Sequence, residues 1–136
     1  MDFDSFWKPI DKVGCNLFGK RFVGAQSVDD VLGVGTELKS RGYGITYNLL
    51  GEHVASKETV ELALRTTREL ISKMNADNSG NVSCKPTLYG LCLSKDKFKD
   101  ILGGLIDQAL DKGIEIEIDA ESYRYIPDTF ETFSYF

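Results

Sequence analysis

The chain has 136 residues, of which 42% are hydrophobic and 27% charged, a composition typical of a soluble globular protein with one domain or part of one. Its formal net charge of −5 argues against a nucleic-acid partner, because a phosphate backbone requires a basic face. No apolar run approaches the roughly 18 residues of a spanning helix, and the N-terminus has no signal-peptide pattern.

Residues 1–26 show no clear periodicity and are expected to form an N-terminal arm. A helix is predicted to follow, because Ser27 is a suitable N-cap, apolar residues recur at helical spacing and Gly42 can end it. Gly33 and Gly35 either weaken this helix, by up to about 1 kcal/mol each relative to alanine, or permit close packing.

Residues 44–50 are predicted to form a strand, and Ser56 to begin a long helix. Residues 82–85 are predicted to form a second, short strand, which Pro86 should end because proline cannot donate to a β-ladder. The predicted buried face of the long helix comprises Val60, Leu62, Ala63, Leu64, Leu70, Ile71 and Met74.

Residues 95–112 form the next predicted helix, ended by Gly113. Residues 114–119 then alternate between apolar and acidic side chains, which predicts a third strand. Pro127 suits the first turn of a further helix. The predicted buried face of the helix over 95–112 comprises Phe98, Ile101, Leu102, Leu105, Ile106, Ala109 and Leu110.

Strands that alternate with helices of this length imply an α/β fold built from right-handed βαβ units, with a parallel sheet. Two architectures fit this order. One is a small doubly wound sheet, and the other is a piece of a (β/α)8 barrel, which normally takes about 250 residues. Periodicity alone does not decide between them.

Charged side chains follow each predicted strand, where function collects in either architecture. Glu52 and His53 follow the first strand, Lys85 the second, and Asp119 and Glu121 the third. A lysine beside carboxylates can hold a charged ligand. The structural alternative is an ion pair of Lys85 with Asp119 or Glu121. The position at the strand ends favours function, whereas a loop histidine is more often only solvated.

The three cysteines, Cys15, Cys84 and Cys92, form an odd set without metal-binding spacing. They are therefore predicted to be reduced thiols in a cytoplasmic protein.

Four segments together resemble the proline dehydrogenase family. They are residues 21–27, 47–52, 82–90 and 116–121, which read RFVGAQS, YNLLGE, VSCKPTLYG and IEIDAE. The resemblance covers residues 21 to about 128 in the family's order. It implies a partial (β/α)8 TIM-type barrel of about three βα units with an N-terminal helix, in which residues 27–136 are the N-terminal portion.

The resemblance also implies a function. Members of this family use FAD to oxidise L-proline to pyrroline-5-carboxylate, and pass the electrons to a membrane quinone. Lys85 and Asp119 match family residues near flavin and proline, which implies catalytic roles for them. Glu52, Glu121 and Asn48 are then expected to orient them or to contact the substrate. Asn48 stands where the family commonly has aspartate. The resemblance thus implies a cytoplasmic flavoprotein, or one peripheral at the membrane.

The chain also departs from the family. It has no Arg-Arg dipeptide and ends at Phe136, so the FAD and substrate site is expected to be incomplete. A separate half-barrel chain or a homo-oligomer would complete it, unless residues 1–26 cover a sheet edge and the chain folds alone. The alternative function is a non-catalytic α/β binding or assembly domain. A phosphate-binding domain fits less well, because Gly33-Val34-Gly35 lies within a predicted helix.

Overall fold

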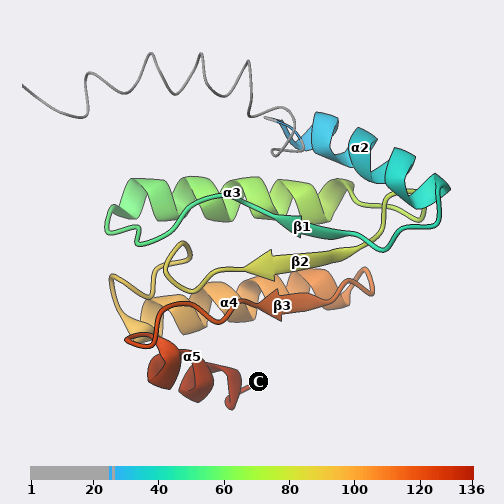
Figure 1. Cartoon of the computed structure of the whole chain (residues 1–136). Coiled ribbons are helices and arrows are strands. Elements are labelled where there is room, and N and C mark those ends of the chain that lie inside the picture. Colours follow the sequence, from blue (N-terminus) through green and yellow to red (C-terminus); the bar gives the residue numbers. More distant parts are fainter. Residues whose placement is uncertain (1–24, 26) are drawn as a thin grey trace, which may run out of the picture.

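The structure is a computed structural model that describes residue 25 and residues 27–136 (Figure 1). Helices and strands alternate along this part of the chain, as the sequence predicts. The elements are α2 (Val28–Ser40), β1 (Thr46–Asn48), α3 (Lys57–Lys73), β2 (Asn81–Cys84), α4 (Lys95–Leu110), β3 (Ile116–Ile118) and α5 (Ile126–Phe133). The arm expected over residues 1–26 lies almost wholly outside the described residues. None of the described helices combines the length and apolar character needed to cross a membrane.

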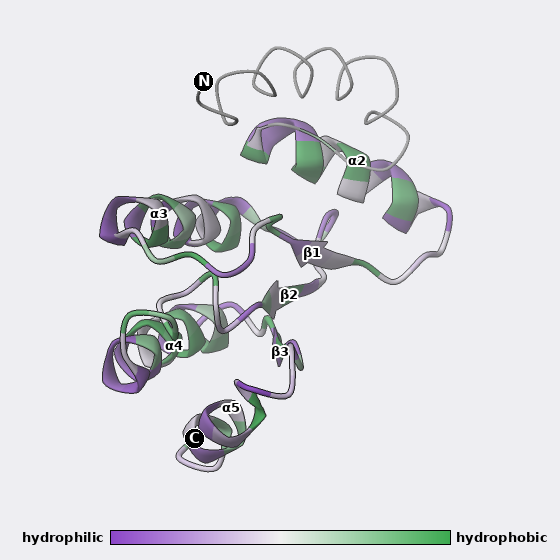
Figure 2. Ribbon diagram, turned by 60° about the vertical axis from the view of Figure 1, so that its left-hand side comes forward, coloured by the Kyte–Doolittle hydropathy of each residue, from purple (hydrophilic) through white to green (hydrophobic). Residues whose placement is uncertain are grey.

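The three strands form one parallel sheet in the order β1-β2-β3. Tyr47 pairs with Val82, which in turn pairs with Ile116. The connecting helices α3 and α4 lie on the same side of this sheet (Figure 2). A doubly wound sheet would carry helices on both faces, so the arrangement is that of a partial β/α barrel.

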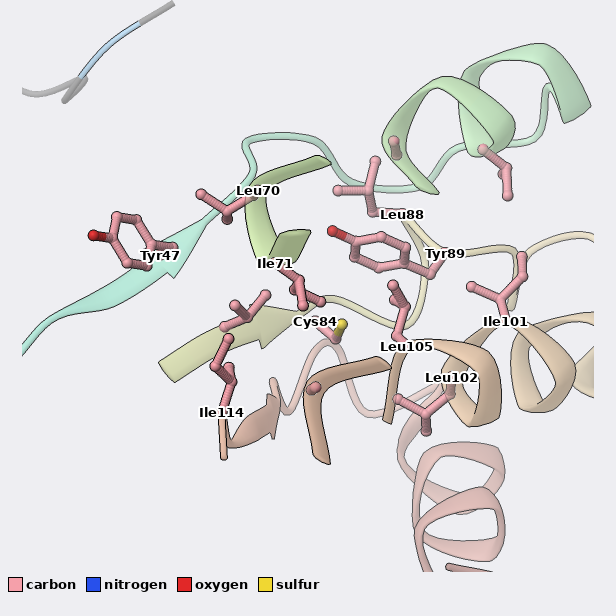
Figure 3. Close-up of a cluster of buried hydrophobic side chains, with 14 of the residues drawn as sticks. Tyr47, Leu70, Ile71, Cys84, Leu88, Tyr89, Ile101, Leu102, Leu105 and Ile114 are labelled. Carbon is pink, nitrogen blue, oxygen red and sulfur yellow. The ribbon is translucent and has the colours of Figure 1, made fainter. Parts of the chain in front are cut away.

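Successive residues of each strand point to opposite faces of the sheet. Tyr47 and Cys84 are buried in the core between the sheet and the helices (Figure 3), and Val82 belongs to the same core. Ile116 and Ile118 pack against this core from β3, which agrees with the predicted alternation of residues 114–119. The most deeply buried helix and loop residues of the core are Val60, Ile71, Tyr89, Phe98, Leu102, Leu105 and Ala109.

A serine caps the start of α2, α3 and α4, the three longer helices among the described residues. The side chains of Ser27, Ser56 and Ser94 accept hydrogen bonds from the backbone N–H groups three residues later. Each such cap stabilises its helix by about 1 kcal/mol relative to alanine. The sequence predicts the first two of these caps, and the structure adds Ser94.

Some predicted details are wrong. Leu62 and Leu110 are exposed, not buried. Leu62 follows the buried Val60 by two residues, which turns it to the opposite side of the helix. β1 and β3 are each 3 residues long and thus shorter than predicted.

Cys84 is expected to be unreactive in the folded protein. Its thiol is buried, and burial raises its pKa from 9.0 to about 12, with a smaller contribution from the charge of Asp119. Alkylation followed by mass spectrometry should therefore leave Cys84 unmodified until the chain is denatured. The half-buried Cys92 serves as the internal comparison, and modification of Cys84 in the native chain would contradict the expectation.

The same shift predicts a loss of stability in alkali. The neutral thiol is favoured in the folded state, so the contribution of Cys84 is complete below the ordinary pKa of 9.0 and is lost as the pH rises toward about 12.

Candidate functional site

No described helix covers the sheet face opposite α3 and α4 (Figure 2), and the strand residues on that face are polar. Asn48 of β1 pairs in register with Ser83 of β2, and Ser83 pairs with Glu117 of β3. Because side chains alternate along a strand, Lys85 and Asp119 continue this face beyond the ends of β2 and β3. The predicted gathering of charged groups at the carboxyl ends of the strands is therefore present.

Lys85 pairs with Glu52 across two neighbouring strand ends. The ammonium Nζ lies 2.9 Å from Glu52 Oε1, and the side chains are 19% and 55% exposed, respectively. The structural alternative of an ion pair between Lys85 and Asp119 or Glu121 is thus wrong in its partner, because the loop after β1 brings Glu52 to the ammonium instead. No other described residue accepts a hydrogen bond from the Lys85 ammonium, so two of its three donors remain available.

This pair shifts both pKa values in the direction that keeps both groups charged. The hydrogen bond from Lys85, together with its charge, lowers the pKa of the Glu52 carboxyl. The hydrogen bond to Glu52 raises the pKa of Lys85 against the effect of desolvation, and the charges of Glu52, Asp119 and Glu121 add to the rise. Lys85 is therefore a firmly protonated cation among three carboxylates.

Asp119 is held by β2 rather than by Lys85. Ser83 Oγ donates to Asp119 Oδ1 at 2.8 Å, and the backbone N–H of Asp119 donates to the carbonyl of Cys84 at 3.0 Å. Asp119 is half-buried, and within the described part of the chain its second oxygen accepts no hydrogen bond. The sequence analysis did not select Ser83. Its position two residues before Lys85 could have identified it, because residues two apart lie on the same face of a strand.

Glu121 uses both carboxylate oxygens to bind Thr87. The backbone N–H of Thr87 donates to Oε2 at 2.7 Å, and the hydroxyl donates to Oε1 at 2.6 Å. This geometry gives Glu121 a structural task. It leaves Lys85, Glu52 and Asp119 as the groups with open donors or acceptors at the carboxyl ends of the strands, a region called the rim below. Thr87 is a second residue that the sequence analysis did not select.

A further acidic side chain, Glu117, lies on the polar face within β3, before the strand ends. Glu117 Oε1 accepts a hydrogen bond from Asn81 at 2.7 Å and a longer one from Thr46 at 3.4 Å. The sequence analysis did not select Glu117, although it is one of the acidic residues that alternate with apolar ones over residues 114–119. Asn48 is exposed on the same face and supplies an amide where the resembled family commonly has a charge.

His53 lies at the outer edge of this rim. It is exposed, and its backbone adopts a φ of 54°, which is uncommon for a residue other than glycine. Its ring centroid lies 5.8 Å from that of Tyr125. The Tyr125 hydroxyl in turn accepts a hydrogen bond from Cys92 Sγ at 3.6 Å.

The fold has counterparts among solved proteins. The crystal structure of proline utilization A (PutA) from Bdellovibrio bacteriovorus, inactivated by N-propargylglycine, matches 91% of this chain with a TM-score of 0.75 and 22% sequence identity. This similarity shows the fold, a partial β/α barrel. The chain spans 16% of the length of that PutA chain. Neither a protein-family model nor a curated protein matches the sequence.

Proposed function

We propose that this chain forms the part of an FAD-dependent proline dehydrogenase barrel that positions L-proline for oxidation to pyrroline-5-carboxylate. The observation that carries the proposal is the position of Lys85 and Asp119. Both lie at the carboxyl ends of adjacent parallel strands on the uncovered face, in a fold similar to that of PutA.

The charges at the rim are complementary to a zwitterionic imino acid. L-Proline carries a carboxylate and a secondary ammonium at neutral pH. The free donors of Lys85 suit the carboxylate, and the open oxygen of Asp119 suits the ammonium. Glu52 fixes the Lys85 ammonium in place from its other side, so the site can orient the substrate before any chemistry occurs.

The polar face also fits one wall of a flavin site. Asn48 and Lys85 offer hydrogen-bond donors at this wall, and Lys85 adds a positive charge. FAD, when bound, would supply the oxidising power by accepting the hydride of the substrate, and a quinone-type acceptor would take the electrons onward. Further contacts would have to come from other parts of a complete barrel, since three strands form less than half of one.

Native mass spectrometry of the full chain mixed with FAD tests this proposal. An assembly that carries FAD, and whose flavin absorbance is bleached by L-proline, is the expected result. N-propargylglycine, which inactivated the PutA protein of that crystal structure, is a second probe and should block the bleaching by proline. A chain that remains a bare monomer at saturating FAD would contradict catalysis by this chain, and would favour the alternative of a non-catalytic binding or assembly domain.

A further inference from the structure

Thr87 is hydrogen-bonded to the loops that follow both neighbouring strands. Its side chain is fully buried at 0% exposure. Its N–H and hydroxyl donate to the two oxygens of Glu121, in the loop after β3. From the loop after β1, the His53 N–H donates to Thr87 Oγ1 at 2.8 Å, and the Val54 N–H donates to the Thr87 carbonyl at 3.1 Å. One residue thus joins all three strand-end loops.

The hydroxyl of Thr87 acts as both donor and acceptor in this network. It donates to a carboxylate at 2.6 Å, a short distance typical of a charge-assisted hydrogen bond. Donation to an anion makes the oxygen a better acceptor for the His53 N–H, because consecutive hydrogen bonds polarise one another. A side chain of the same shape without the hydroxyl would lose both bonds, because it could neither donate to Glu121 nor accept from the His53 N–H.

The bond to His53 controls where Glu52 lies. A φ of 54° at His53 is unfavourable for a residue with a Cβ and persists only where the surroundings hold it. The two N–H bonds to Thr87 supply that restraint on either side of the His53 α-carbon. Glu52 directly precedes His53, so this backbone conformation sets the approach of Glu52 Oε1 to Lys85 Nζ at 2.9 Å.

We propose that Thr87 is a positioning residue whose hydroxyl holds the loop after β1 in place, so that Glu52 remains paired with Lys85. Thr87 would not touch the substrate. The relevance of this positioning to catalysis rests on the proposed function, but the positioning itself is measured in the full chain without any ligand.

The test compares Thr87→Val with Thr87→Ser. Valine preserves the branched shape without the hydroxyl, whereas serine preserves the hydroxyl. In Thr87→Val, NMR titration should show a lower Lys85 pKa than in the unmodified chain, because Glu52 no longer raises it. Amide exchange at His53 should also accelerate, by about tenfold or more for the loss of one buried hydrogen bond. Thr87→Ser should restore both readouts.

Thr132→Val is the matched control. Thr132 is also buried, at 2% exposure, but its hydroxyl has no hydrogen-bond partner among the described residues. This variant should leave the Lys85 pKa and His53 exchange unchanged. If Thr87→Val does not fold, Glu121→Gln replaces it, because it weakens the anchor of Thr87 and should accelerate His53 exchange by less. Only the exchange readout counts for this variant, since the charge of Glu121 itself raises the Lys85 pKa.

A folded Thr87→Val chain with an unchanged Lys85 pKa and unchanged His53 exchange would overturn the positioning role. If Glu121→Gln has to replace it, unchanged His53 exchange in that folded variant would overturn the role equally. A failure to bind FAD or to oxidise proline would overturn the proposed function and leave this result intact, because neither NMR readout requires a ligand. The two ideas can therefore fail separately.

Discussion

Replacement of Gly35 by alanine is expected to destabilise the protein by about 3 kcal/mol, through overpacking and a lost hydrogen bond. Gly35 is the point at which α2 contacts β1, and an added Cβ would collide with the hydroxyl of Tyr47. The ring is buried, and its hydroxyl donates to the carbonyl of Asn78 at 2.7 Å. Tyr47 would have to move and give up this bond, or α2 would have to shift away from the sheet.

Gly33→Ala in the same helix provides the matched control and should have the opposite effect. Nothing lies within 4 Å of a Cβ at Gly33, so alanine should stabilise the chain by up to about 1 kcal/mol through helix propensity. The measurement is the free energy of unfolding of both variants in urea. Equal changes in the two variants would show that α2 does not pack on β1 through Gly35.

Replacement of Lys85 by methionine is expected to have the largest effect on function. It removes the cation of the rim while preserving the length and apolar character of the stem. Loss of a charge-assisted hydrogen bond of about 1.5–3 kcal/mol should weaken proline binding by about tenfold or more. Equilibrium binding of L-proline to the FAD-loaded chain measures this. The fold should hold, because the partner Glu52 is exposed to water.

A second readout for Lys85→Met requires no ligand. The pKa of Glu52 is lowered by its hydrogen bond to Lys85 and by the charge of Lys85. The carboxyl should therefore titrate at higher pH in the variant. Lys95→Met is the matched control, since Lys95 Nζ lies 2.7 Å from Glu131 in an ion pair away from the rim. Equal losses of proline binding in both variants would argue against a specific role for Lys85.

The order of the elements was predictable from sequence because helical and alternating patterns are local. The serine caps at Ser27 and Ser56 and the position of Pro86 mark boundaries that the structure places within a few residues. The packing role of Gly35 was only one of two alternatives, since a helix pattern does not reveal which glycine faces a tyrosine hydroxyl. Neighbours far apart in the sequence decide that question.

The candidate site was predictable in place but not in its pairing. Parallel strands bring their carboxyl ends to one edge, so Lys85, Glu52 and Asp119 were expected to be close together. The choice of Glu52 as the partner of Lys85 depends on the left-handed backbone conformation at His53, which is uncommon for residues other than glycine. The role of Thr87 depends on four hydrogen bonds across three loops, and no spacing rule encodes them.

The sequential order of the strands has a consequence for how the chain acquires its structure. In the sheet β1-β2-β3, each strand pairs only with strands adjacent in the sequence. During synthesis, β2 can therefore pair with β1 as soon as it leaves the ribosome, and β3 can then pair with β2. No described strand has to wait for a partner beyond the next strand. Each closure therefore spans a single connecting segment, from Tyr47 to Val82 and from Val82 to Ile116, and costs less entropy than a pairing across several elements. Assembly by successive addition exposes one new sheet edge at a time.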